Sequence, residues 1–305
     1  MWHREDRTAL CNIILPIQQA PNTPRRSAAI CLFSFLLTFT TCGTVFSFGI
    51  YQELYQAMSL QPNTPFTGAT PAGIDIIGTL SAAFMLVGAP FATAWAKRFS
   101  PRFIIYIGAG ILFAATMMAS YSQHLWQFIL TQGFLMGVGT CFSYIPAVTV
   151  APTWFGKHRG VALGIILSGT GLGGLCWAPA LHALNEHLGF RNGIRISGCI
   201  SAGLVLVGGT VLDWDPATKA RIREENARLR ARSSSWFGTL WNVPLVDWRI
   251  ARTAKFSAQL SANVMQAAAY YTPVFFFSAY ARTLGYSAQQ GANFISVSGL
   301  LKDRC

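Results

Sequence analysis

The chain has 305 residues, of which 52% are hydrophobic and only 11% are charged. A soluble globular domain carries about 25% charged residues, because its surface must stay wetted. Together with a 13% share of aromatic residues, this composition excludes a disordered polypeptide and argues against an ordinary cytosolic enzyme.

Long stretches without Asp, Glu, Lys or Arg divide the chain into candidate membrane spans. The longest of them, 103–153, contains 51 residues, whereas a helix needs about 20 mostly apolar residues to cross the hydrocarbon core. The alternating segments of a membrane β-barrel are absent from the sequence. We therefore predict an all-α polytopic membrane protein with spans near residues 28–51, 74–96, 103–122, 125–152, 160–182, 194–212, 256–281 and 286–301.

The spans and the loops between them predict four regions. They are an N-terminal cytoplasmic tail (1–26), a six-helix transmembrane bundle (27–212), a basic cytoplasmic connector (213–255), and helices seven and eight of an incomplete second bundle (256–305). Within the connector, Asp215 is the predicted N-cap and Pro216 the first residue of a polar helix. This layout is typical of one six-helix half followed by the start of a second.

The distribution of Lys and Arg predicts that the N-terminus is cytoplasmic. With the N-terminus inside, the tail and the cytoplasmic loops up to residue 255 contain 18 of these residues, and the outer loops contain only Arg191, Arg195 and Arg282. Because cytoplasmic loops are enriched in Lys and Arg, the net charge of +12 indicates topology and not a nucleic-acid partner. The expected partner is the lipid bilayer, and the expected location is the plasma membrane.

The residue types of metal sites and active sites do not form recognisable patterns. The seven cysteines show no CxxC and no metal-ligand spacing. A G-x-G-x-x-G run at 169–174 lies inside a span instead of following a strand, so we interpret it as a close helix-packing surface. No cofactor, no metal and no enzymatic activity are predicted.

Polar residues at helical spacing mark the first, fourth and seventh spans. Such residues are costly in lipid unless they face protein or a watery cavity. They could form the wall of a cavity, or they could form hydrogen bonds that hold neighbouring helices together. The hydroxyl groups could also bond to carbonyl oxygens of their own helix. The candidates for a substrate cavity are Ser47, Tyr51, Gln132, Tyr144, Gln259, Asn263, Gln266 and Tyr270.

Several stretches resemble the fungal, monocarboxylate-porter-like members of the major facilitator superfamily. They are Ser47–Gln52 followed by Tyr55, Arg98–Arg102, Gln132–Phe155, Arg159–Ile165 with Ser168–Gly169 and Leu172–Gly174, and Gly189–Arg191. The resemblance implies a secondary transporter with two six-helix halves, moving a small organic acid or a secondary metabolite. It also implies a cavity between the halves, walled by helices one, four, seven and ten.

The resemblance further implies a cytoplasmic gating loop at Lys97, Arg98 and Arg102. Lys97 stands where the family usually carries an Asp, and the first predicted span holds none of the charges that handle protons in animal members. We therefore assign no proton-coupling role to Asp303 or Arg304.

Two alternatives to an active transporter remain. The chain ends before a second six-helix half is complete, so it could be a non-transporting fragment, or it could self-associate or need a complementing chain. A seven-span receptor or sensor would fit the span count, but its N-terminus would lie outside.

Overall fold

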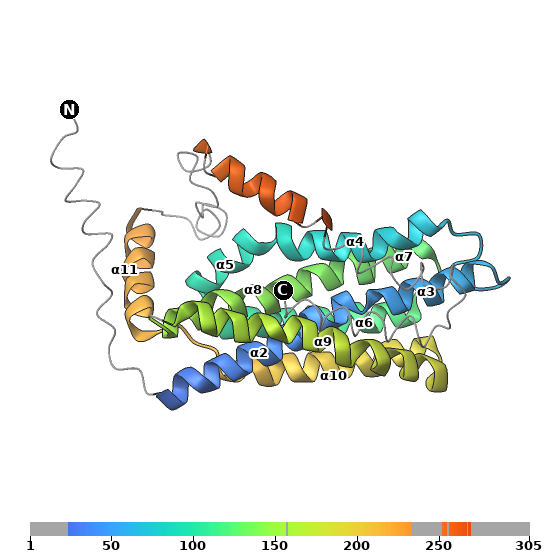
Figure 1. Ribbon diagram of the computed structural model, residues 1–305, viewed down its shortest axis with the longest axis horizontal. Coiled ribbons are helices and arrows are strands. Elements are labelled where there is room, and N and C mark those ends of the chain that lie inside the picture. The colour runs from blue at the N-terminus through green and yellow to red at the C-terminus, as the bar shows by residue number, and fades with distance from the viewer. Residues whose placement is uncertain (1–23, 157, 233–251, 255, 267, 270–305) are drawn as a thin grey trace.

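The computed structural model describes residues 24–156, 158–232, 252–254, 256–266 and 268–269. These residues form helices, turns and short connections, and no strand occurs among them. Figure 1 shows the long helices running side by side along one axis, with α11 lying across one end of the bundle. We call that end the α11 end, and the opposite end, which carries the connection 60–70, the loop end.

The first span is longer than predicted. Helices α2 (Pro24–Phe46) and α3 (Phe48–Ser59) follow each other directly and together make a 36-residue candidate span. The extension beyond Tyr51 carries Glu53, which is buried, so the absence of charge holds only for the predicted part. The neighbouring helices bury both Glu53 and Gln52. Gln52 Nε2 donates to Asp75 Oδ1 at 2.6 Å.

The second span is bent. Helices α4 (Pro71–Val87) and α5 (Ala89–Arg98) meet at an angle of 44°. Pro90 lies at the start of α5 and has no backbone N–H to continue the helix ladder, and Gly88 precedes it. Proline and glycine at such a junction are the usual cause of a sharp kink.

The third and fourth spans pack against each other. Helix α6 (Pro101–Tyr121) is regular, whereas the fourth span changes its winding along its length. Its segments are α7 (Leu125–Phe128), the π-helical η1 (Ile129–Leu135), α8 (Met136–Val150) and the 3₁₀ turn η2 (Ala151–Trp154). Short π-helical segments occur frequently at functional sites.

The fifth and sixth spans complete the bundle, and a further helix follows them. They are α9 (Arg159–Leu188) and α10 (Phe190–Val211), and the helix that follows is α11 (Pro216–Arg232). Five helices of the described part are long and apolar enough to cross a membrane, or six if α4 and α5 form one span. These six agree with the predicted spans to within about four residues at each end, with two exceptions: α3 extends the first span to Ser59, and α9 continues six residues beyond the predicted end of the fifth.

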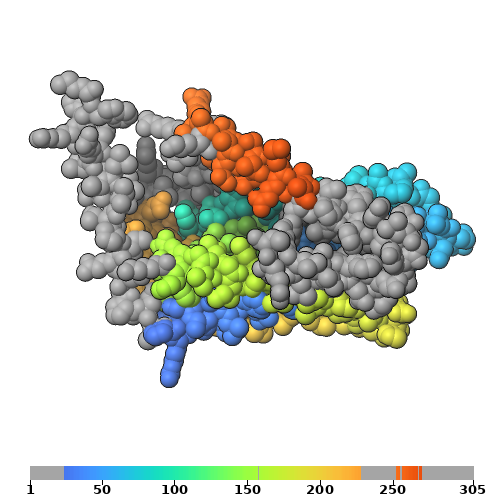
Figure 2. All heavy atoms as spheres, in the orientation of Figure 1, coloured from blue at the N-terminus to red at the C-terminus, as the bar shows by residue number. Residues whose placement is uncertain are grey.

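Only part of the predicted seventh span belongs to the described residues. Residues 254–269 are helical where they are described, and their side chains are exposed. Figure 2 shows this segment, in orange-red, at the surface. The rest of the seventh span and the whole of the eighth lie outside the described residues.

Glycines bring α2 and α9 into backbone contact. A Cβ added to Gly43 would lie 2.8 Å from Gly173 Cα, and one added to Gly169 would lie 2.8 Å from the carbonyl oxygen of Phe35. The close approach lets Thr38 Oγ1 donate to the Ile166 carbonyl oxygen at 2.6 Å. The glycine run thus serves helix packing, as predicted from its place inside a span.

Candidate substrate pocket

A buried pocket lies at the centre of the bundle and is enclosed by all six spans. Its lining combines apolar side chains such as Phe48 and Leu181 with neutral polar groups. Within the described part of the chain, no lining residue carries a charge. The polar side chains are Thr44, Tyr51, Ser81, Thr116, Gln132, Ser197 and Ser201.

The pocket is nearly closed in this conformation. Its volume is about 40 Å³, which is room for about three water molecules at ~10–15 Å³ each. It can therefore hold one small polar group, and a whole metabolite would fit only if the surrounding helices moved apart.

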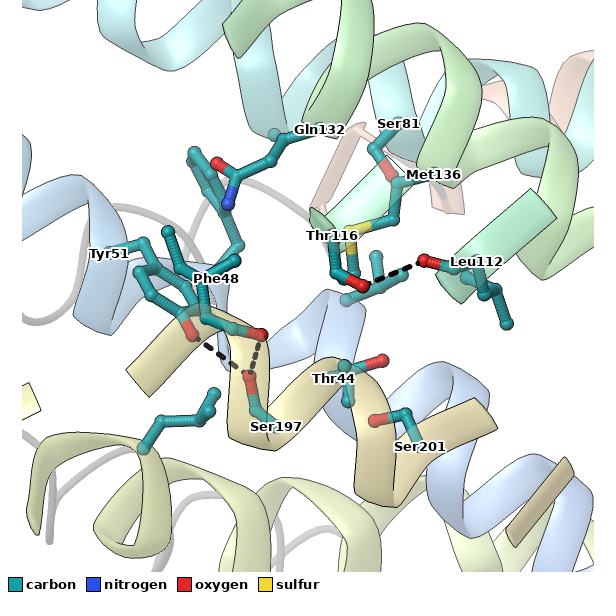
Figure 3. A pocket seen from close by; sticks show the side chains of 15 residues that line it. Thr44, Phe48, Tyr51, Ser81, Leu112, Thr116, Gln132, Met136, Ser197 and Ser201 are labelled. Carbon is teal, nitrogen blue, oxygen red and sulfur yellow. Dashed lines mark hydrogen bonds between the residues drawn. The ribbon is translucent and has the colours of Figure 1, made fainter. Parts of the chain in front are cut away.

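Two hydrogen bonds organise its walls. Tyr51 on α3 and Ser197 on α10 face each other with their hydroxyl oxygens 3.4 Å apart, as Figure 3 shows. Ser197 Oγ donates to the carbonyl oxygen of Ile194 at 3.1 Å, so Tyr51 is the donor of the pair. On another wall, the Tyr55 hydroxyl donates to Gln132 Oε1 at 2.9 Å.

Of the four predicted site residues in the first six spans, two line the pocket and two do not. Tyr51 and Gln132 line the same pocket. Ser47 is buried, and its hydroxyl donates to the Gly43 carbonyl oxygen of its own helix at 2.7 Å. Tyr144 is half-buried and packs against an apolar core cluster. Ser47 and Tyr144 are not among the residues that line the pocket.

The predicted polar stripe of the seventh span is only partly described. Gln259, Asn263 and Gln266 are exposed, and Gln259 Nε2 donates to Asn263 Oδ1 at 3.3 Å, which places these two residues on one helix face. Tyr270 lies outside the described residues.

Sequence reasoning missed the pocket residues of the second, third and sixth spans. Ser197 and Ser201 stand four residues apart, so a helical stripe was visible in the sequence. Isolated hydroxyls in spans often bond back to their own helix, as Thr116 does to the Leu112 carbonyl oxygen at 3.0 Å. The sequence pattern alone therefore does not separate pocket hydroxyls from packed ones.

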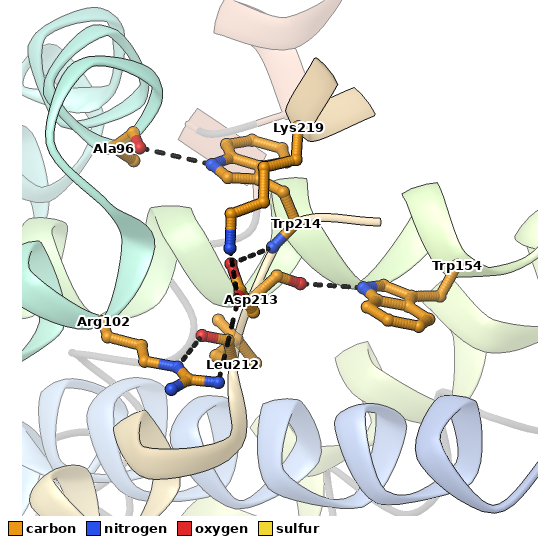
Figure 4. Close-up of polar contacts among 7 residues, drawn as sticks. All are labelled: Ala96, Arg102, Trp154, Leu212, Asp213, Trp214 and Lys219. Carbon is orange, nitrogen blue, oxygen red and sulfur yellow. Dashed lines mark hydrogen bonds and ion pairs between the residues drawn. The ribbon is translucent and has the colours of Figure 1, made fainter. Parts of the chain in front are cut away.

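A second polar cluster fixes the chain that follows α10 to the α11 end of the bundle. Arg102, from the predicted gating loop, places Nη2 3.8 Å from Asp213 Oδ2 and donates from Nε to the Leu212 carbonyl oxygen at 3.0 Å. Lys219 Nζ lies 2.8 Å from the same carboxylate oxygen. Figure 4 shows both cations converging on Asp213. Arg102 therefore has a carboxylate partner although position 97 is a lysine.

Two indole groups add to this cluster. Trp154 Nε1 donates to the Asp213 carbonyl oxygen at 2.8 Å, and Trp214 Nε1 donates to the Ala96 carbonyl oxygen at 3.2 Å. The side chain of Asp215 accepts from the Ala217 amide at 3.1 Å, which confirms the predicted cap of α11.

The other two predicted gating residues lie at the end of α5. The carbonyl oxygen of Lys97 accepts from Asn226 Nδ2 of α11 at 3.2 Å. Arg98 occupies the last turn of the helix. The main chain of this loop thus contacts α11 directly.

The helices and the buried neutral pocket define an integral, multi-pass α-helical membrane protein. Residues 28–301 match the sequence model of the Major Facilitator Superfamily. The chain belongs to this superfamily.

Three relatives illustrate the similarity. The agnestins efflux protein AgnL12 of Paecilomyces divaricatus is 34% identical over 184 residues, which cover 60% of this chain and 41% of that protein. The probable transporter MCH2 of Saccharomyces cerevisiae is 31% identical over 278 residues, which cover 88% of this chain and 54% of that protein. Monocarboxylate transporter 7 of Homo sapiens is 24% identical over 204 residues, covering 66% and 37%. The chain matches 54% or less of the length of each.

Proposed function

We propose that this chain acts in a secondary transporter that moves a small organic acid or a secondary metabolite across a membrane. The observation that carries the proposal is the pocket of neutral hydrogen-bonding groups, which all six spans of a superfamily bundle enclose. Superfamily membership favours this function over a seven-span receptor. The names of the relatives, an efflux protein for agnestins and a monocarboxylate transporter, support both substrate classes.

The lining of the pocket argues for cargo without a net charge. No cation lines the pocket within the described residues, and an isolated carboxylate in an apolar site is costly unless it is paired. We propose Tyr51 and Gln132 as substrate contacts on this bundle. Ser47 and Tyr144 would support the wall, and Gln259, Asn263, Gln266 and Tyr270 would belong to the facing surface of the second bundle.

We propose that the protein lies in the plasma membrane with its N-terminus in the cytoplasm. The predicted excess of Lys and Arg in the connector and in the loops at the α11 end supports this orientation. The cluster around Asp213 would then hold the connector against the cytoplasmic end of the bundle, beside the gating residues Lys97, Arg98 and Arg102.

Counterflow in proteoliposomes tests the proposal. The purified chain is reconstituted in liposomes loaded with unlabelled L-lactate or an unlabelled hydroxyanthraquinone, and entry of the labelled compound is followed. We expect exchange of at least one probe above the rate of empty liposomes. Rates equal to those of empty liposomes for both probes, beside a control transporter that exchanges lactate under the same conditions, would contradict the proposal.

A further inference from the structure

Two arginines at the start of α10 converge on the last residues of α6. Arg191 Nη1 donates to the carbonyl oxygen of Ser120 at 2.8 Å, and Arg195 Nε donates to the hydroxyl of the same residue at 2.9 Å. Ser120 is fully buried. The arginines are one helical turn apart, so their side chains share one face of α10. The two helices pack against each other, and both reach the loop end of the bundle (Figure 1).

Aromatic rings hold both guanidinium groups. Arg195 Cζ lies 4.6 Å from the centroid of the Tyr121 ring, and Arg191 Cζ lies 5.4 Å from the centroid of the Phe190 ring. Both distances are within the reach of about 6 Å that a cation–π contact has. The two cations are therefore held in place before any ligand binds, which lowers the entropic cost of binding one.

The described residues give neither arginine an acidic partner. None of the ion pairs within this part of the chain involves Arg191 or Arg195. Glu186, near the end of α9, lies 3.5 Å from His182 instead. Like charges one turn apart on a helix repel each other, and both arginines are half-buried. An anion bound between them would offset this repulsion.

Most of the hydrogen-bonding capacity of the two arginines is left over. A guanidinium group has five N–H donors in a planar fork, and the described residues accept one bond from each group. Both bonds end on Ser120, so the two forks lie close together. Such forks bind phosphate oxygens with two parallel hydrogen bonds. The pair is therefore suited to a single phosphate group.

Stabilisation of the α6 terminus explains only one of the two cations. The last turn of a helix carries partial negative charge and carbonyl groups without an intrahelical partner. The bond from Arg191 to the Ser120 carbonyl oxygen satisfies one of these groups. Arg195 donates to a side chain instead. The second charge therefore needs another explanation.

An exposed apolar surface adjoins the two arginines. Both α6 and α10 are long and apolar enough to cross a membrane. Their exposed side chains include Phe113, Met118 and Tyr121 on α6, and Ile196 and Ile200 on α10. In a membrane protein such a surface faces acyl chains, and an exposed tyrosine at its end is typical of the headgroup level. Cations beside an apolar surface fit a phospholipid better than a soluble anion.

We propose that Arg191 and Arg195 bind the phosphate of a phospholipid headgroup whose acyl chains lie on the exposed surface of α6 and α10. Each guanidinium donates to phosphate oxygens, and the bonds to Ser120 keep the two forks in position. The bound lipid stabilises the contact between the two helices at the loop end. The inference goes beyond the proposed transport function and requires only that the chain is an integral membrane protein.

Native mass spectrometry of the purified chain in dodecyl maltoside tests the site. The probes are dioleoylphosphatidylglycerol and digalactosyldioleoylglycerol, which has the same chains and no phosphate. Arg191→Gln and Arg195→Gln should each weaken binding of the first phosphatidylglycerol about tenfold, the effect of one charged hydrogen bond. Arg221→Gln, at an exposed position of α11, should leave it unchanged. Unchanged affinity in either loop-end variant, or equally tight binding of the galactolipid by wild type, would overturn the proposal.

Glycerol 3-phosphate distinguishes a lipid site from a site for a soluble anion. It carries the phosphate and has no acyl chains, so it cannot bury apolar surface. Its Kd should therefore be at least about a hundredfold higher than the Kd of the phospholipid. A similar Kd for both compounds would mean that the arginines bind free phosphate compounds, and it would overturn the assignment to lipid.

Thermal unfolding separates lipid binding from a purely structural role of the arginines. Each Gln variant loses a bond to Ser120, so its midpoint without lipid should fall in any case. The informative quantity is the rise in midpoint that phosphatidylglycerol causes within each protein. Wild type and Arg221→Gln should show this rise, and the double variant Arg191→Gln/Arg195→Gln should not. An equal rise in the double variant would overturn the proposal.

Arg195→Lys keeps the test decisive where the double variant does not fold. The lysine keeps the positive charge, so phosphatidylglycerol should still raise the midpoint of this variant more than that of Arg195→Gln. The same small rise in both variants would show that the charge does not bind lipid, and it would overturn the proposal.

Discussion

Arg102 and Asp213 meet across the α11 end of the bundle, with Nη2 3.8 Å from Oδ2. Lys219 approaches the same carboxylate oxygen at 2.8 Å. The side chains of Arg102 and Lys219 are 41% and 44% exposed, so water and salt screen both ion pairs. The indole hydrogen bonds of Trp154 and Trp214 are more deeply placed and hold the same segment without such screening.

Replacing Asp213 by Asn should destabilise the protein only slightly. The change removes the charge and keeps the shape and the backbone carbonyl that accepts from Trp154. Exposed ion pairs contribute about 0.2–1 kcal/mol each, so the thermal midpoint in detergent should fall by a few degrees at low salt and less at high salt. Glu224→Gln, at an exposed position of α11, should leave the thermal midpoint unchanged at both low and high salt. A large loss that salt does not reduce would contradict this explanation.

Gly173→Ala should be destabilising, whereas Gly174→Ala should not. A methyl group at residue 173 would meet the Phe39 carbonyl oxygen and lie 2.9 Å from Gly43 Cα. Both are backbone atoms, so α2 and α9 must move apart, at about 1–3 kcal/mol. Nothing lies within 4 Å of a methyl group at residue 174, where Ala is also the better helix former. Thermal unfolding of the two purified variants checks the contrast, and equal midpoints would contradict it.

Gly198→Ala should fill the pocket. A methyl group there would meet the side chain of Thr116, and both residues line the pocket. Overpacking of about 1.4 kcal/mol corresponds to a tenfold loss of affinity. We expect counterflow in proteoliposomes to slow by about that factor. Gly203→Ala lies on the same helix, where an added methyl group meets nothing within 4 Å, and it should exchange substrate as wild type does. Equal exchange by both variants would show that the pocket is not the site.

Single cysteines test the orientation. Gln61 on the loop end and Ala220 on α11 are both exposed. In intact cells, a membrane-impermeant maleimide should label Gln61→Cys above the background of the parent protein and should label Ala220→Cys only after permeabilisation. The reverse pattern would place the N-terminus outside and contradict the positive-inside assignment.

The spans were predictable because the membrane imposes a simple rule on the sequence. Charges are excluded over about 20 residues, and gaps such as 103–153 therefore locate α6 and α8 closely. The start of α11 was predictable for a similarly local reason, since Asp215 caps a helix that begins at Pro216. The sequence did not predict that the first span continues beyond Tyr51. Tertiary packing is the reason, because Gln52 and Glu53 are buried by neighbouring helices.

The contacts between distant residues were not predictable from one sequence. Tyr55 and Gln132 are 77 positions apart, and their hydrogen bond depends on how α3 packs against the π-helical η1. The same is true of Arg102, whose carboxylate partner lies beyond the sixth span. On the first span, Thr44 and Ser47 both donate to carbonyl oxygens of their own helix, yet only Thr44 lines the pocket.

Lactate counterflow by three matched proteins is the most direct test of a transporter that uses this pocket. The proteins are the wild-type chain, Gln132→Met, and Gln123→Met, which changes the same residue type at an exposed position of the loop end. We predict that wild type and Gln123→Met exchange labelled lactate equally, and that Gln132→Met exchanges it about fivefold more slowly at equal reconstitution. Equal exchange by all three proteins, or exchange of neither lactate nor the hydroxyanthraquinone by the wild type, would contradict the central claim.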